Sequence, residues 1–201
     1  MNPTLRIRAA LPGDAPFAAS MIHLSMDHLA DYLFQLTTDV IQAVIAKLFA
    51  RDAGRFGYSD AFIAEFENWP VGLLIASRGD RINRLNLEII PHLVAVLGFT
   101  KTIGFIHRGV RLPGGREAYD DEFFLGNLGI LPSMQRRSFG SQMLAYAEEL
   151  ARENNLMKCS LIVGGHNTGA RRLYERIGYQ VVETVQDENK SLGYYRMVKV
   201  L

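Results

Sequence analysis

The alternation of apolar and polar positions predicts short strands in the first part of the chain. Residues 5–9 place apolar side chains at every second position, the pattern of a half-buried strand. Two further strand-like runs occupy residues 61–66 and 71–77. Residues 67–70, Glu-Asn-Trp-Pro, form a connection short enough for a hairpin. We therefore expect an opening strand followed later by a two-stranded hairpin.

Helical spacing predicts two helices between these strands. Asp14 follows a Pro-Gly turn and is the expected N-cap of the first helix. The apolar face of that helix is expected to carry Phe17, Met21, Leu24 and His28. Asp39 is the expected N-cap of the second helix, whose apolar positions include Val40, Val44, Ile45, Leu48 and Phe49.

Residues 78–121 form the least regular segment. Leu85 to Leu97 is an apolar helical candidate, and Lys101 to Arg108 is a weaker one. The first stretch is too apolar for a helix exposed on all sides. We expect this insert to extend the core or to form a homodimer contact, with a substrate-pocket wall as the alternative.

From residue 123 the pattern is regular to the end of the chain. It predicts a strand at Phe123–Leu131, a helix at Ser138–Asn154, a strand at Met157–Val163, a helix at Thr168–Arg176, and strands at Tyr179–Val185 and Tyr194–Val200. Strands and helices that alternate after a hairpin favour an α/β chain of the α+β type, a mixed sheet covered by helices. A length of 201 residues suits a single domain.

Composition and charge exclude several classes of partner. There are 22 basic and 21 acidic residues, for a formal charge of +1, and no block of like charge. This balance argues against a charge-driven nucleic-acid or membrane partner. The single cysteine, Cys159, excludes an intrachain disulfide framework and a cysteine-based zinc site, and it is expected to be a buried packing residue. No signal peptide is evident in residues 1–10, so we expect a cytoplasmic protein. Separately, we expect no metal.

The turn formed by residues 135–140, Gln-Arg-Arg-Ser-Phe-Gly, joins a predicted strand to the start of a predicted helix. Such a turn presents unpaired backbone N–H groups at the positive end of the helix dipole, an arrangement suited to phosphate. It lacks the Gly-Lys-Ser/Thr ending of a P-loop and the three glycines of a dinucleotide fingerprint. Taken alone, the spacing fits an ordinary strand-to-helix loop at least as well.

A second cluster gives the turn a specific meaning. The pattern Gln135-x-x-Ser138-x-Gly140 resembles the pyrophosphate loop of the GNAT acetyltransferases, and Asn167-x-x-Ala170-x-x-Leu173-Tyr174-Glu175-x-x-Gly178-Tyr179 resembles the motif that follows it in that family. The resemblance covers residues 123–201. It implies the GNAT fold: a central mixed, mostly antiparallel sheet of six to seven strands flanked by helices. Residues 123–185 would be the acetyl-CoA-binding core, and 78–121 a helical insert before it.

The resemblance assigns a cofactor role to eleven residues. The strand residues Leu128, Gly129 and Ile130 would pair with the pantetheine arm, and the loop residues Gln135, Arg136, Arg137, Ser138, Phe139, Gly140 and Ser141 would hold the pyrophosphate. Asn167 would bind near the pantetheine, although an N-cap role for the helix at Thr168 is equally consistent. Ser138 stands where the family usually has glycine. A positive φ would strain it, whereas its hydroxyl could bind phosphate or cap the helix.

The same resemblance implies transfer of an acetyl group from acetyl-CoA to a primary amine by direct attack. Tyr174 would be the general acid that protonates the departing thiolate. Glu122 and His166 are the candidate general bases, and a water chain to solvent would need neither. The acceptor is a small molecule or a protein amine. His23 and His28 are expected to have no ligand role. The alternative function is a non-catalytic acyl-CoA-binding domain with the same fold.

Overall fold

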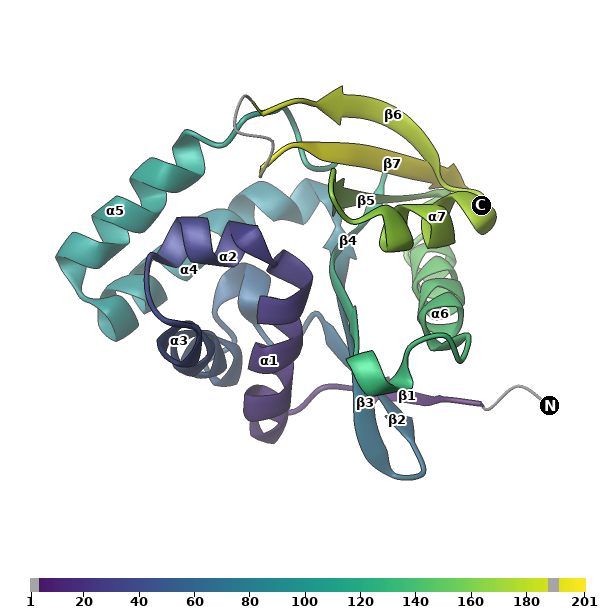
Figure 1. The fold of residues 1–201 in the computed structure, drawn as a ribbon, viewed down its shortest axis with the longest axis horizontal. Helices are drawn as coiled ribbons and strands as arrows, with labels where there is room; N and C mark the ends of the chain where they lie inside the picture. The colour runs from purple at the N-terminus through teal and green to yellow at the C-terminus, as the bar shows by residue number, and fades with distance from the viewer. Residues whose placement is uncertain (1–3, 188–191) are drawn as a thin grey trace.

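The computed structural model describes residues 4–187 and 192–201. Seven strands form one sheet in the order β1-β2-β3-β4-β5-β7-β6 (Figure 1). All neighbouring strands are antiparallel except β4 and β5, which are parallel. The strands are β1 Arg6–Ala9, β2 Ala61–Phe66, β3 Trp69–Arg78, β4 Phe123–Ile130, β5 Lys158–Gly164, β6 Gln180–Val185 and β7 Tyr194–Val200. The predicted mixed, mostly antiparallel sheet is therefore confirmed.

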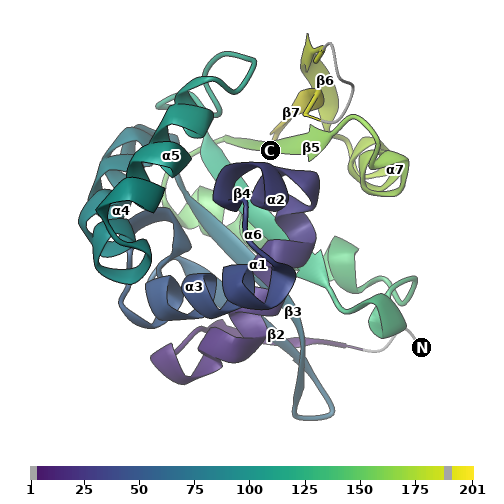
Figure 2. The same ribbon diagram turned by 60° about the vertical axis from the view of Figure 1, so that its left-hand side comes forward.

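Helices cover both faces of the sheet. On one face lie α1 Ala15–Met26, α2 His28–Phe34, α3 Thr38–Ala50, α4 Ile82–Leu97 and α5 Phe99–Val110, and on the other lie α6 Phe139–Glu153 and α7 Thr168–Arg176 (Figures 1 and 2). Each layer encloses a hydrophobic core of its own. The first core contains Phe49 and Leu93, and the second contains Phe139 and Met143, all at most 1% exposed.

The parallel contact between β4 and β5 is short. It comprises three residue pairs, from Phe123 opposite Cys159 to Leu125 opposite Leu161. Directly after Leu125, β4 has a bulge at Gly126, because Ala76 of β3 pairs with Leu125 while the adjacent Ile75 pairs with Asn127. A bulge bends a strand and increases its local twist. Beyond this point β4 continues with β3 alone, and the edge that faced β5 is open.

The N-terminal helices differ from the prediction in their caps and their number. Asp14 is the N-cap residue of α1, as predicted, but its carboxylate binds Arg8 at 2.8 Å and the Leu11 N–H at 2.7 Å and makes no cap hydrogen bond to the helix. In α3 the N-cap is Thr37, and Asp39 lies in the first turn. A break at Asp27, where φ is 49°, separates α1 from α2. His28 therefore does not lie on the face of α1.

The insert is helical, as predicted. Helix α4 contributes Leu85, Ile89 and Leu93 as buried side chains, so it extends the core. Helix α5 is anchored to the end of α2 by Arg108, whose Nε and Nη2 donate to the Leu33 carbonyl at 2.9 and 2.6 Å. Phe99, at the start of α5, is 70% exposed. A dimer contact on this surface stays a prediction.

Among the described residues, no single helix has the length and apolar character needed to cross a membrane; α2 and α3 reach them only as a pair, with an 84° bend between them.

Candidate active site

A cleft of about 1580 Å³ opens where β4 and β5 separate. Its walls are residues 125–130 of β4, residues 161–164 of β5, the start of α6, one side of α7, and the end of α1. Pockets for single small ligands usually enclose about 300–1,000 Å³. This cleft therefore has room for an extended cofactor together with a second substrate. None of its lining residues belongs to α4 or α5, so the insert does not wall it.

The β4 wall offers backbone rather than side chains. Leu128, Gly129 and Ile130 all line the cleft. They lie beyond the three residues of β4 that pair with β5, so their backbone edge on that side is unpaired. Gly129 also lets α1 approach the strand, because a Cβ added there would lie 3.2 Å from the Met21 carbonyl oxygen. An extended ligand with amide groups can add to such an edge as another strand. The three predicted strand residues are thus placed together at the cleft.

The turn before α6 adopts an unusual backbone conformation. Arg136 and Ser138 have φ values of 61° and 64°, so both occupy the left-handed region that favours glycine. The first bond of the helix runs from the Gln142 N–H to the Ser138 carbonyl at 3.1 Å. The N–H groups of residues 139–141 consequently have no acceptor within the helix. The Ser138 side chain makes no cap bond.

Other residues of the turn hold it in place. The Gln135 side-chain amide donates to the Ile130 carbonyl at 3.2 Å, which links the turn to the end of β4. Phe139 is 1% exposed, and its ring centroid lies 5.2 Å from that of Phe66. A Cβ at Gly140 would lie 3.1 Å from Leu173, so α6 and α7 approach closely there. The side chains of Gln135 and Phe139 are therefore structural, and a cofactor would meet this turn mainly through its backbone.

Positive charge in the cleft comes from three arginines. Arg136 lines it, as predicted, together with Arg172 and Arg176 of α7. Arg137 is exposed and is not among the lining residues. Arg172 and Arg176 were missed from the sequence because nothing in the spacing distinguishes them from a solvated helix face.

Two residues of the second motif, Asn167 at the N-cap of α7 and Tyr174 within the helix, line the cleft. The Asn167 Oδ1 accepts a hydrogen bond from the Ala170 N–H at 3.0 Å, which is an N-cap, and Asn167 also lines the cleft. Tyr174 lines the cleft too but is only 8% exposed. Burial raises the pKa of the Tyr174 phenol to about 12. This hydroxyl therefore remains protonated at neutral pH, as a proton donor must.

Glu122 lies outside the lining of the cleft. Its carboxylate binds the guanidinium of Arg196, and both side chains are 5% exposed. A carboxylate that is committed to a buried arginine is a poor proton acceptor, so the interpretation of Glu122 as a base is not supported. Glu122 directly precedes β4, at the end of that strand which still pairs with β5, and not at the open edge.

His166, the other candidate base, lines the cleft at the turn between β5 and α7. Its Nε2 lies 2.6 Å from the Oδ2 of Asp27, a cleft residue that sequence analysis missed. The ring of His28 lies 5.0 Å from that of His166, measured between centroids. Asp27, His28 and His166 each place one potential metal ligand atom within 4.8 Å of the others. The expectation of no metal stays a prediction.

Ser25 and Asn127 are further polar residues of the cleft that sequence analysis missed. The Asn127 amide donates to the Ser25 hydroxyl at 2.8 Å, and that hydroxyl donates to the Ile22 carbonyl at 2.9 Å. This chain ties β4 to α1 beside the bulge. A polar residue in an otherwise apolar strand was the only signal for Asn127.

Comparisons with known proteins agree with this geometry. The model of the acetyltransferase (GNAT) family matches residues 50–179. The uncharacterized N-acetyltransferase YycN of Bacillus subtilis (strain 168) is 33% identical over 67 residues, which cover 33% of this chain and 43% of that protein. This chain therefore aligns with less than half the length of that relative.

Solved structures match over almost the whole chain. An N-acetyltransferase from Staphylococcus aureus Mu50 has a TM-score of 0.72 at 21% identity, covering 96% of this chain and 99% of the other. The PaiA N-acetyltransferase from Thermoplasma acidophilum, solved in complex with coenzyme A, has a TM-score of 0.56 at 13% identity, covering 98% and 99%. At these identities the likeness concerns the fold.

Proposed function

The chain belongs to the GNAT acetyltransferase family, and from this premise we propose that it transfers an acetyl group from acetyl-CoA to a primary amine. The observation that carries the proposal is the open edge of β4 beside the α6 turn, both in one cleft. The pantetheine amides would pair with the backbone of Leu128 and Ile130. The pyrophosphate would lie on the N–H groups before and within the first turn of α6.

The charges of the cleft support the same orientation of acetyl-CoA. Arg136, Arg172 and Arg176 lie among the lining residues that include the α6 turn. Their guanidinium groups would pair with phosphates, which arginine binds through several donors at once. The acetyl end of the cofactor would then point toward the part of the cleft where β4 and β5 separate. Ser25, Asp27 and Asn127 lie on the α1 side of the lining, where an acceptor amine would enter.

The reaction would proceed by attack of a neutral amine on the thioester carbon. The new N–C bond forms as the C–S bond breaks, and the electron pair of the C–S bond leaves on sulfur. Tyr174 would donate its phenolic proton to that thiolate as charge develops. A pKa of about 12 keeps this donor fully protonated before the step. The acceptor is a small-molecule amine or a protein amine.

The cofactor site is tested by calorimetry with a matched pair of variants at Ser141, in the first turn of α6. In Ser141→Glu, a carboxylate would favour the helix dipole but repel a bound pyrophosphate. Ser141→Gln has nearly the same size without the charge. We expect Ser141→Glu to weaken acetyl-CoA binding at least about tenfold more than Ser141→Gln, although its melting temperature should be no lower than that of Ser141→Gln. Equal affinities in the two variants would place the phosphates elsewhere.

Catalysis is tested by thiol release with a library of amines. We expect Tyr174→Phe to bind acetyl-CoA like the wild type and to lose about 10²–10⁴-fold in kcat. Tight binding of acetyl-CoA with no thiol release from any amine would contradict the transferase proposal. That result would favour a non-catalytic acyl-CoA-binding domain.

A further inference from the structure

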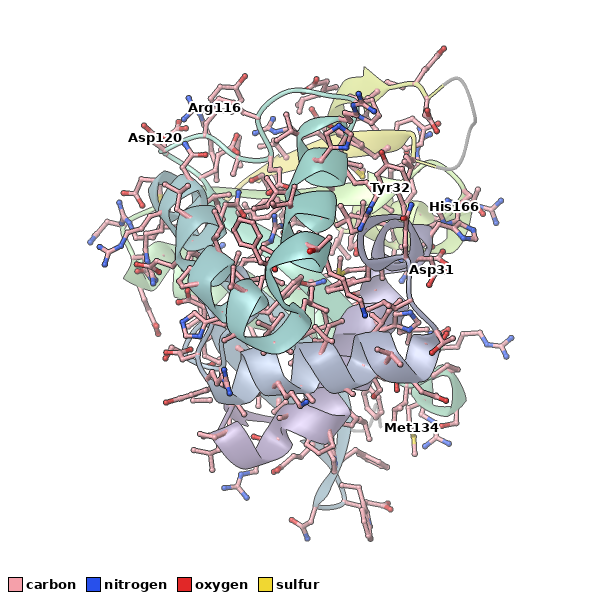
Figure 3. All side chains as sticks on the ribbon, turned by 90° about the vertical axis from the view of Figure 1, so that its left-hand side faces the viewer. Asp31, Tyr32, Arg116, Asp120, Met134 and His166 are labelled. Carbon is pink, nitrogen blue, oxygen red and sulfur yellow. The ribbon has the colours of Figure 1, made fainter. Side chains whose placement is uncertain are left out.

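Two segments far apart in sequence place an acid and an imidazole together in the lining of the cleft. Asp27 lies between α1 and α2, and His166 lies between β5 and α7. The Asp27 Oδ2 and the His166 Nε2 are 2.6 Å apart, the distance of a charge-assisted hydrogen bond. Asp27 is the only carboxylate among the described residues that line the cleft. His166 lies at the edge of the molecule, on the side of Asp31 and Tyr32 of α2 (Figure 3).

The backbone fixes both residues. The Asp27 N–H donates to the His23 carbonyl, and the Asp27 carbonyl accepts from Ala30, each at 3.0 Å. The His166 carbonyl accepts from the Thr168 N–H at 2.9 Å. The imidazole rests against Gly164, where an added Cβ would lie 3.0 Å from Cε1. The hydrogen bonds fix the main chain of both residues, and the contact with Gly164 limits where the imidazole ring can lie.

On the basis of the proposed function, we infer that His166 is the general base for the acceptor amine and that Asp27 is its positioning residue. The need for a base follows from the substrate. A lysine-like amine with a pKa of about 10.4 is neutral in less than about one part in a thousand at pH 7. Only the neutral form has the lone pair that attacks the thioester.

The contact with Asp27 also selects the tautomer of His166. A carboxylate accepts hydrogen bonds, so Nε2 carries the proton and Nδ1 carries the lone pair. Within the described part of the chain, Nδ1 makes no hydrogen bond, so it is free to accept a proton from an amine directly or through one water. The His166 side chain is 39% exposed, which gives that proton a path to solvent.

A hydrogen bond between Asp27 and His166 accounts for the distance between their Oδ2 and Nε2 atoms better than a preformed metal site does. Two ligands of one tetrahedral zinc ion, each about 2.0–2.1 Å from it, lie about 3.3 Å apart. The Asp27 and His166 atoms are closer than that, at 2.6 Å. His28 completes the group of possible ligands but is not among the cleft-lining residues. A metal site would need His28 as its third ligand, whereas a general base at His166 does not need His28.

The proton balance of the step is complete without another reactant. His166 Nδ1 takes one proton from the ammonium group and releases it to solvent. The nitrogen lone pair forms the N–C bond, the C–S bond breaks, and Tyr174 protonates the sulfur. The second nitrogen proton leaves as the amide forms, and Tyr174 regains a proton. The sum is an amide, a free thiol and one proton in solution.

The test compares kcat for two amines of similar shape, phenethylamine and β,β-difluorophenethylamine, with the full chain after treatment with EDTA. Fluorine lowers the basicity of the second amine, so much more of it is neutral at the same pH. We expect His166→Ala to lower kcat about 10²–10⁴-fold with phenethylamine and less than about tenfold with the fluorinated amine. Asp27→Asn should show the same dependence on amine basicity with a smaller loss. Added imidazole should restore part of the rate of His166→Ala but none of the rate of Tyr174→Phe.

Two controls separate this inference from folding and from the proposed function. His28→Asn should keep kcat within about twofold of the wild type, and all variants should bind acetyl-CoA with wild-type affinity. If His166→Ala affects both amines equally, or neither, the inference is overturned while the transferase proposal stands. If the wild type neither binds acetyl-CoA nor releases thiol with any amine, the proposed function fails, and this inference fails with it.

Discussion

Glu122 and Arg196 form a buried ion pair that joins the residue before β4 to the middle of β7. The Glu122 carboxylate also accepts from the Tyr119 N–H at 2.9 Å, and Arg196 Nε donates to the Glu117 carbonyl at 3.3 Å. The Arg196 guanidinium lies 4.8 Å from the centroid of the Tyr119 ring. Strand β7 pairs with β5, so this cluster anchors the end of the insert to the C-terminal part of the sheet.

Removing one partner of this pair is expected to be far more destabilising than removing both. Arg196→Met leaves Glu122 buried without its partner, which costs about 3–5 kcal/mol of unfolding free energy. The double variant Glu122→Gln/Arg196→Met removes both charges and should recover a large part of that loss. Urea unfolding followed by circular dichroism measures both values. Equal losses in the single and double variants would mean that the charges are not coupled.

Ser138→Gly tests whether the α6 turn is strained. A non-glycine residue in the left-handed conformation costs about 1–2 kcal/mol, and glycine avoids that cost but loses more backbone entropy on folding. We expect Ser138→Gly to change the unfolding free energy by no more than about 1 kcal/mol in the stabilising direction. Ser138→Val, a β-branched residue at the φ of 64° seen here, should destabilise the chain and weaken acetyl-CoA binding.

Calorimetry on Ser138→Gly also tests whether the hydroxyl group of Ser138 contacts a phosphate. If acetyl-CoA binds Ser138→Gly as tightly as the wild type, the hydroxyl does not contact a phosphate. A loss of affinity in this variant, with an unchanged melting temperature, would show that it does.

Asn167 is expected to act as a helix cap whether or not it touches the cofactor. Asn167→Ala removes the acceptor of the Ala170 N–H and should cost about 0.5–2 kcal/mol of unfolding free energy. Asn167→Ser keeps a capping oxygen and should be nearly as stable as the wild type. A Ser variant that is stable but binds acetyl-CoA more weakly would show that the longer amide also reaches the ligand.

Local signals were sufficient to predict much of the second half of the chain. Helix α7 was predicted at its observed ends, because Asn167 is a strong N-cap and the helix is followed by Gly178, whose φ is 102°. A hairpin connection was predicted at residues 67–70; the observed turn is shorter, because β3 begins at Trp69, and its two residues Glu67 and Asn68 adopt the positive φ values that such turns use. In each case the determining residues are neighbours in sequence.

The residues that were missed depend on tertiary contacts. Asp27 reaches His166 across 139 positions of the chain, from the single residue that separates the end of α1 from the start of α2. Glu122 likewise meets its partner Arg196 across 74 positions of the chain. The residue pattern of a single sequence does not show which side chains that are distant in sequence are in contact in the fold. The motifs predicted residues of β4 and of the α6 turn that line the cleft, but not Ser25 and Asp27 on its α1 side.

Buried groups with raised pKa values are expected to make the protein lose stability at alkaline pH. Desolvation raises the pKa of Cys159 from 9.0 to about 12 and that of Tyr174 from 10.0 to about 12. Well below pH 9 both groups are protonated in the folded and the unfolded states. Above these ordinary values, the unfolded chain releases protons that the folded chain retains, so the unfolding free energy falls as pH rises.

Each group that ionises only on unfolding steepens this fall by up to about 1.4 kcal/mol per pH unit. Cys159→Ala should therefore flatten the curve from about pH 9 upward, and Tyr174→Phe from about pH 10 upward. Urea unfolding at a series of pH values and constant ionic strength gives the slopes. Leu144→Ala, which removes a fully buried side chain that does not titrate, should lower the curve without changing its slope. If all four curves run parallel, neither Cys159 nor Tyr174 is the source of the alkaline instability.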